Sequence, residues 1–253
     1  MSAQTADRRG FEVTADLFIG AVVVAGTAVV GSSLRNIVAD GLDARHLAWL
    51  GIAVLTLLVG RLSVRLPFPN CRVSFSDALI FLSVLVFGGD FGTLTAALDG
   101  FASSSRQTGS IHKTAFNTAG MAVSVRLSAW LFAQLLPDAV SAQRLSPADL
   151  LLPVGALALA QYVLNTVLVS IAVALKDHAS FVATWRTASP WAGVAYLTGS
   201  LAAAAVFVAV RDLGVIFAFV VLPFPVILHF TFRACLSQLI RQKATAPVRL
   251  NHP

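Results

Sequence analysis

The chain has 253 residues, of which 57% are hydrophobic and 12% are charged, whereas about 25% of an average soluble domain is charged. With a mean hydropathy of +0.80 and a pI near 10.1, this composition excludes a disordered chain, a soluble enzyme and a basic nucleic-acid-binding domain. The net charge of +6 is typical of the short basic loops of bacterial membrane proteins. We therefore predict a protein that crosses the membrane several times and contacts lipids, not nucleic acid.

Eight apolar segments are candidates for membrane helices, since about 20 helical residues cross the hydrocarbon core. In chain order they are 14–33, 47–64, 76–87, 91–102, 114–136, 149–175, 190–210 and 214–232. The third and fourth are short and are joined by a Gly88-Gly89-Asp90 turn, so they form a hairpin, a re-entrant pair or two thin spans. We predict an all-α transmembrane bundle, 14–232, of about six full spans plus this hairpin, between the tails 1–13 and 233–253.

Lysine and arginine residues are distributed unevenly over the two predicted faces. Most of the 18 lie on the face that holds both termini, and Arg126 lies within a span. The opposite face holds Arg35, Arg45, Arg144 and Arg211. Because positive loops are retained in the cytoplasm, both termini are predicted to be cytoplasmic, in the inner membrane of a bacterium.

A helix rises about 1.5 Å per residue, so the position of a residue along its segment gives its depth in the membrane. This depth places one group of polar residues toward the cytoplasmic side. Asp77 lies 12 residues before Gly89 and Asp99 lies 10 residues after it, so folding at the turn brings the two carboxylates to a similar level. Asn117 and His229 lie near the inner ends of their spans. These residues either lock the hairpin against its neighbours or have ordinary structural roles, at a helix N-terminus for Asp77 and at the interface for His229.

A second group of polar residues is predicted in the outer half of the bundle. Arg126 lies 13 residues after Lys113, and Gln161 lies at about the same depth on the next antiparallel helix. Gln161 and Asn165 are one turn apart on one face, with Tyr162 alongside. Arg126, Gln161, Tyr162 and Asn165 are therefore our candidate contacts for an anionic or polar ligand. The alternative is that Gln161 bonds another helix and Arg126 extends toward the headgroups.

No residue pattern in the sequence indicates catalysis or metal binding. A Ser-His-Asp order, an HExxH motif and a Walker loop are all missing from the sequence. Cys71 and Cys235 are too few and too far apart for a disulfide framework or a zinc motif. The letters Gly88-Gly89-Asp90 occur in a cyclase signature, but here they lie in a turn between apolar segments. The sequence predicts a protein that is not an enzyme and has neither metal nor cofactor.

A series of short motifs runs through the middle of the chain. They are Arg65-Leu-Pro-Phe-Pro, Val73-Ser-Phe-Ser-Asp77, Phe87-Gly88, Ala96-Ala-Leu-Asp99-Gly100 and Lys113-Thr-Ala-Phe116-Asn117, followed by Tyr162-Val-Leu-Asn165-Thr, Trp185 and Leu222-Pro223. With these motifs, the region 47–232 resembles the membrane-associated sensor (MASE-type) module found N-terminal to HD-GYP phosphodiesterases and diguanylate cyclases in bacteria. That module is similar in turn to the S component of energy-coupling-factor (ECF) vitamin transporters.

The resemblance implies a compact helical bundle that binds a small molecule in a pocket toward the outer face. It also implies a partner, either a separate signalling output or an energising transporter subunit, and Ala21 and Ala25 are the positions that match a docking face. We therefore expect a sensor input or a stand-alone solute binder. A proton-coupled transporter that uses Asp77 or Asp99 is the alternative, and a purely structural subunit is the third possibility.

Overall fold

The computed structural model describes residues 3–41, 43–60, 64–65, 72–73, 76–136 and 142–214. In chain order the elements are α1 (Ala3–Ala39), α2 (Ala44–Val59), β1 (Val64–Arg65), β2 (Arg72–Val73), α3 (Ser76–Phe87), α4 (Gly89–Thr108), α5 (Ile111–Gln134), the 3-10 helix η1 (Ala142–Arg144), α6 (Pro147–Lys176) and α7 (Phe181–Leu213). Apart from the short antiparallel pair of β1 and β2, the regular structure in these ranges is helical, which confirms the predicted all-α class. Most of the eighth predicted segment, with His229, and the tail 233–253 lie outside the described residues.

Among the residues that the structure describes, three helices are long and apolar enough to cross a membrane. They are Phe11–Ala39 within α1, Pro147–Lys176, and Ala192–Leu213 within α7. Large hydrophobic side chains are exposed on all three helices, among them Leu17, Val24, Leu152, Leu159 and Leu197. Long helices with outward apolar side chains suit contact with lipid tails. By length and composition, the structure therefore supports a membrane protein with three candidate spans.

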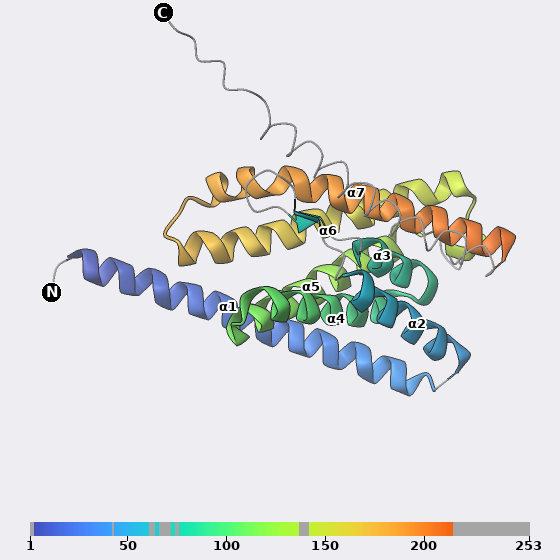
Figure 1. The fold of residues 1–253 in the computed structure, drawn as a ribbon, viewed down its shortest axis with the longest axis horizontal. Helices are drawn as coiled ribbons and strands as arrows, with labels where there is room; N and C mark the ends of the chain where they lie inside the picture. Colours follow the sequence, from blue (N-terminus) through green and yellow to red (C-terminus); the bar gives the residue numbers. More distant parts are fainter. Residues whose placement is uncertain are drawn as a thin grey trace, which may run out of the picture.

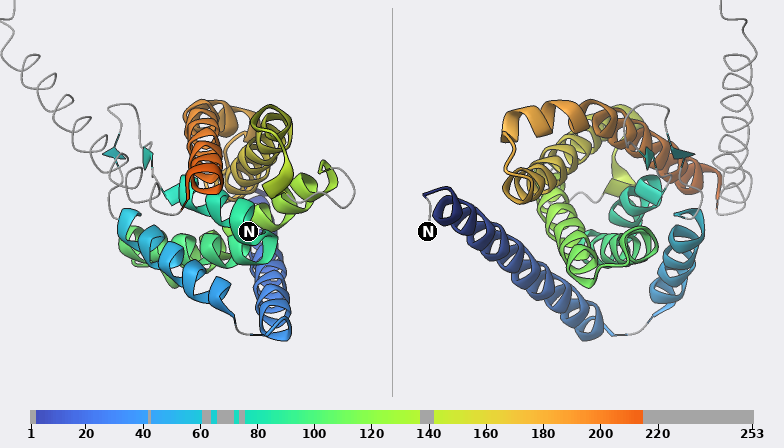
Figure 2. Two further views of the ribbon diagram at one scale, coloured as in Figure 1. Left: turned by 90° about the vertical axis from the view of Figure 1, so that its right-hand side faces the viewer. Right: turned by 60° about the vertical axis from the view of Figure 1, so that its left-hand side comes forward.

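The helices are arranged in three layers (Figure 1). α6 and α7 pack together on one side, α1 and α2 lie on the opposite side, and α3, α4 and α5 lie between them. α1 packs against α4, α5 and α6, whereas α2 packs against α3 and α4. In Figure 2, α1 and α2 lie at the periphery of the group formed by the other five helices. The bundle interior is therefore formed mainly by α3 to α7.

α3 is a core helix that other helices enclose. Eight of its residues are buried: Ser76, Leu79, Ile80, Phe81, Leu82, Ser83, Val84 and Leu85. It packs against α7, α4 and α2. Its 12 residues extend about 18 Å, which is less than the roughly 30 Å of a hydrocarbon core. The short apolar segment 76–87 is thus explained by enclosure within longer helices.

The turn between α3 and α4 requires glycine. Gly88 has φ 97°, a left-handed conformation that side chains other than glycine rarely adopt. α4 then continues to Thr108, where Gly109 ends it with φ 59°. The predicted fourth segment, 91–102, is too short because the helix continues past the apolar residues into a polar stretch that includes Ser103 and Ser104. α3 and α4 therefore form the predicted hairpin, but with arms of unequal length.

Contacts between distant helices define two ends of the bundle. At one end, which we call the Lys113 end, the start of α5 lies near the start of α1 and the end of α6, where Lys176 Nζ lies 2.7 Å from Asp16 Oδ1. At the other end, which we call the Arg126 end, the tip of the α3–α4 hairpin meets the last turn of α1 and the second half of α5. Consecutive helices therefore run up and down, as the eight-segment reading predicted.

α1 contacts the bundle through a glycine. A Cβ built on Gly26 would overlap Ala119 of α5, so only glycine allows the two helices to approach so closely here. The predicted docking positions Ala21 and Ala25 are both exposed and lie outside this contact. They therefore belong to the outer surface of α1 and do not hold it to the bundle.

Two helices begin earlier than the sequence indicated. α7 begins at Phe181 instead of 190 and contains Pro190 in its interior, because neighbouring helices can compensate a proline inside a membrane helix. α1 begins at Ala3, so residues 3–13 of the predicted N-terminal tail continue the first helix. Neither Pro190 in α7 nor the polar residues before 14 in α1 end the helix in which they lie.

Candidate functional site

A cavity of about 200 Å³ lies among α3, α4, α5, α6 and α7, and we call it the carboxylate cavity. Its polar lining residues are Asp77, Asp99, Ser103, Asn117, Asn165 and Tyr196. The rest of its wall is formed by Gly100, Phe116, Gly120, Met121, Leu168 and Val169. The cavity brings together Asp77, Asp99 and Asn117, which the sequence grouped, with Asn165, which the sequence assigned to another layer.

Asp99 is almost completely removed from solvent, with 7% of its surface exposed. Its carboxylate accepts a hydrogen bond from the Ser76 side chain and is attracted by Arg106. Its Oδ1 nevertheless has no hydrogen-bond partner among the residues that the structure describes. A Cβ on Gly60 would lie 2.9 Å from this oxygen, so the C-terminus of α2 closes that side. A buried carboxylate oxygen without a donor is costly unless a ligand or water supplies one.

Asp77 contributes the second carboxylate, from the first turn of α3. It lies close enough to Asp99 for the two negative charges to repel each other. Gly199 of α7 passes beside it, because a Cβ on that glycine would lie 3.5 Å from the Asp77 Cβ. None of the described residues that line the cavity is Lys, Arg or His. The wall therefore presents acidic groups without a basic residue among them.

The two asparagines in the cavity wall use their amide nitrogens in interhelical hydrogen bonds. Asn117 Nδ2 donates to Ser104 Oγ at 2.9 Å, which joins α5 to α4. Asn165 Nδ2 donates to the Tyr196 hydroxyl oxygen at 2.7 Å, which joins α6 to α7. In both residues the amide oxygen is the atom left to face a ligand. The wall is consequently rich in hydrogen-bond acceptors.

Tyr196 is one of two polar cavity residues, with Ser103, that the sequence analysis did not single out. It is 7% exposed, and its ring meets Phe81 of α3 edge-on with 6.2 Å between the ring centroids. The chain has only 2 Tyr, and a phenol within an apolar helix needs a hydrogen-bond partner. That requirement is the feature of the sequence from which a role for Tyr196 could have been predicted.

A larger groove of about 1030 Å³ lies beside the cavity, between α1, α5 and α6 at the Lys113 end. Its rim carries Asp16, His112, Lys113, Lys176 and Asp177. The groove and the carboxylate cavity share Phe116, Asn117 and Val169 in their walls. The groove therefore adjoins the cavity on the side of Asn117.

Arg126 lies in a separate cluster at the Arg126 end. Its Nη1 lies 2.5 Å from Asp90 Oδ1, and the same carboxylate accepts from Asn36 Nδ2 at 3.4 Å. Arg126 does not line the carboxylate cavity that holds Asn165. The structure therefore does not bring Arg126 together with Asn165 in this cavity, because equal depth does not place two residues on facing sides of their helices. Asp90, the partner of Arg126, was not among the predicted residues.

Gln161 and Tyr162 contribute to helix packing outside the cavity lining. Gln161 is 1% exposed, and its Oε1 accepts from Ser128 Oγ at 3.4 Å across the α5–α6 interface. The Tyr162 ring lies 6.5 Å from that of Trp185, and a Cβ on Gly193 would contact it at 3.4 Å. These positions agree with the alternative reading, in which Gln161 bonds a neighbouring helix.

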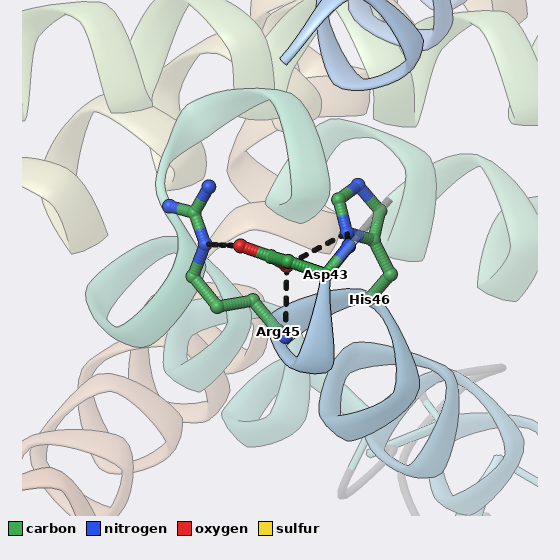
Figure 3. Close-up of polar contacts among 3 residues, drawn as sticks. All are labelled: Asp43, Arg45 and His46. Atoms are coloured by element: carbon green, nitrogen blue, oxygen red, sulfur yellow. Dashed lines mark hydrogen bonds and ion pairs between the residues drawn. The ribbon is translucent and has the colours of Figure 1, made fainter. Parts of the chain in front are cut away.

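A third polar cluster begins α2 and caps it (Figure 3). Asp43 Oδ1 accepts from the Arg45 backbone at 2.9 Å, Asp43 Oδ2 accepts from Arg45 Nε at 2.8 Å, and the Asp43 backbone donates to His46 Nδ1 at 3.0 Å. The hydrogen bond and charge of Arg45 lower the pKa of Asp43 to about 2. This arrangement is a capping box, so its polar groups serve the helix end.

Comparisons with protein-family models, curated proteins and solved structures found no match to this chain. Within the described residues, no group of three or more His, Cys, Asp or Glu side chains is placed to hold a metal ion. The carboxylate cavity is the strongest candidate site on geometric grounds, because its wall brings together two carboxylates, two asparagines and a tyrosine.

Proposed function

We propose that the protein is a non-enzymatic integral membrane protein that binds a small polar molecule in the carboxylate cavity. It acts as a sensor input or as a stand-alone solute binder similar to an S component, in the bacterial inner membrane with both termini cytoplasmic. The single observation that supports binding most strongly is a cavity lined by the two acidic residues Asp77 and Asp99 with no basic residue among the described residues of its wall. Acidic groups in an enclosed wall without a basic neighbour favour a site completed by a ligand.

The size of the cavity limits the ligand. At about 200 Å³ it is smaller than the roughly 300 to 1,000 Å³ of sites for drug-sized molecules. At about 30 Å³ per water molecule, it has room for roughly six or seven waters. The ligand of this cavity is therefore smaller than a typical vitamin.

Gly120 offers a direct test, because it lines the cavity and a Cβ there would meet nothing within 4 Å. Gly120→Leu fills the cavity and leaves every polar lining group in place. Gly51→Leu is the matched control, since Gly51 is an exposed helical glycine whose added Cβ also meets nothing. We expect native mass spectrometry of the purified protein to show a bound small molecule in the wild type and in Gly51→Leu, but not in Gly120→Leu. Equal retention in all three proteins would contradict the proposed site.

A proton-coupled transporter is the second candidate, and the pair of carboxylates supports it. Two acidic groups share one cavity, and that cavity adjoins a groove at the Lys113 end, as expected for a proton relay beside a solute pathway. The transporter predicts solute uptake into liposomes that hold only this protein, driven by a pH gradient. Uptake that persists when Asp77 and Asp99 are both changed to Asn would exclude proton coupling through them.

A further inference from the structure

Resting on the proposed function, we infer that the carboxylate cavity selects a small organic cation that carries a primary ammonium group. The inference concerns the charge and the hydrogen-bonding groups of the ligand, which the proposed function leaves open. It is supported by the balance of charge, by the inventory of acceptors and by the aromatic part of the wall.

The first step concerns charge. When both are ionised, Asp77 and Asp99 bring two negative charges to one wall, and their repulsion is relieved by a cation between them. Arg106 acts on Asp99 from outside the lining residues, so it offsets about one of these charges. A cation in the cavity favours the ionised form of both carboxylates, and the surplus of one negative charge in that state matches a monovalent cation and opposes an anion.

The second step concerns hydrogen bonding. The acceptor groups that line the cavity are the carboxylates of Asp77 and Asp99 and the amide oxygens of Asn117 and Asn165, whose amide nitrogens already donate elsewhere. An ammonium group has three donors and no acceptor, so it satisfies several of these oxygens at once. A quaternary ammonium carries the same charge without donors and leaves these acceptors without a hydrogen bond.

The third step concerns the remainder of the ligand. The wall between the polar groups is apolar and partly aromatic, with Phe116, Met121 and Leu168. These side chains suit a short alkyl chain attached to the ammonium group, and an aromatic ring also attracts a nearby cation. A bare metal ion would leave this apolar part of the cavity without contacts.

The test measures binding of n-butylammonium chloride to the full chain in lipid nanodiscs by isothermal titration calorimetry. The neutral 1-butanol controls for size, and tetramethylammonium controls for charge without donors. We expect saturable binding of n-butylammonium, none of 1-butanol, and tetramethylammonium weaker by about tenfold, since hydrogen bonds to charged groups are worth that much. Binding of n-butylammonium no tighter than that of 1-butanol would overturn the inference, as would competition by equimolar Na⁺.

Carboxylate variants identify the groups responsible. Asp77→Asn is expected to weaken n-butylammonium binding about tenfold or more, and Asp99→Asn to weaken it as well. Asp40→Asn is the matched control, because Asp40 is exposed and lies outside the cavity, and it should bind like the wild type. Each variant is first checked for monodisperse elution. If Asp77→Asn does not fold, Asp99→Asn and Gly120→Leu provide the same test. Unchanged binding of n-butylammonium in both of these variants would refute the assignment.

The failure of this inference is distinguishable from that of the proposed function. A neutral or anionic molecule that co-purifies with the wild type and is lost in Gly120→Leu would keep the binding function and overturn the cationic ligand. Loss of n-butylammonium binding in Gly120→Leu but not in Gly51→Leu would support both.

Discussion

Two polar clusters inside the same bundle differ in how their charges are balanced. At the Arg126 end, one arginine faces one carboxylate, and Asn36 donates to that same carboxylate. In the carboxylate cavity two carboxylates share a wall without a basic lining residue, and Asp99 Oδ1 has no donor among the described residues. A balanced cluster stabilises a fold, whereas an unbalanced one reduces stability and is retained where it binds something. The comparison therefore contrasts a cluster that serves the fold with the cluster that we propose as a binding site.

The largest effect is expected when the balanced cluster is broken. Arg126→Ala leaves Asp90 without its cation in a partly buried place, so we expect the free energy of unfolding to fall by about 1 to 3 kcal/mol. Binding of n-butylammonium by the folded fraction should not change. Denaturant titration in detergent measures the first quantity and calorimetry the second. In the double variant with Asp90→Ala, the loss should be smaller than the sum of the two single losses, and strict additivity would show that the pair does not interact.

The unbalanced cluster should respond in the opposite direction. Asp77→Asn removes one of two repelling carboxylates, so without ligand we expect the free energy of unfolding to rise by about 1 kcal/mol. The same variant is expected to bind n-butylammonium more weakly, so stability and affinity change in opposite directions. A destabilised Asp77→Asn protein would indicate that Asp77 is a structural residue, and the comparison between the clusters would fail.

A smaller effect is expected from the cation that acts on Asp99. Arg106→Gln removes the positive charge that offsets Asp99, so the cavity should bind n-butylammonium about three- to fivefold more tightly, as expected for one screened charge. Arg35→Gln is the control, because Arg35 is exposed near the opposite end of the bundle. The gain should shrink as salt is raised. Weaker binding in Arg106→Gln would show that Arg106 positions Asp99 rather than opposing the ligand.

The smallest effect concerns the capping box of α2. Since the pKa of Asp43 is lowered to about 2 from its ordinary 3.8, its ionised form stabilises the folded state above pH 4. That contribution is lost as the pH falls from about 4 to about 2. We expect the wild type to lose stability in this window relative to Asp43→Asn, which lacks the titrating group. Parallel pH profiles for the two proteins would show that the Arg45 contact does not persist in solution.

Much of the bundle could be predicted from the sequence because hydropathy sets which segments are helical, although several helices extend beyond the predicted ends. The turn at Gly88 and the similar level of Asp77 and Asp99 follow from residue spacing alone, and the structure places both carboxylates in one cavity. The place of Asn117 beside α4 came from the same reading of depth. Depth along antiparallel helices is a local property, so a single sequence determines it well.

The side of each helix that faces a given neighbour was not predictable in this way. Arg126 and Asn165 lie on consecutive helices, yet one bonds Asp90 and the other bonds Tyr196. The rotation of a helix depends on packing between segments far apart in the chain, such as Gly26 of α1 against α5. Depth along the helices therefore groups Arg126 with Asn165, although in the structure the two side chains have different partners.

The enclosure of α3 also constrains how the protein is made. During synthesis α3 emerges before its neighbour α7, with α4, α5 and α6 made in between. Until α7 arrives, Asp77 lacks the cover that Gly199 provides, and a carboxylate exposed to lipid costs several kcal/mol. The carboxylate cavity is thus completed among the last steps of biogenesis, when α7 brings Tyr196 to Asn165. A chain interrupted before α7 would insert its first helices and still lack the site.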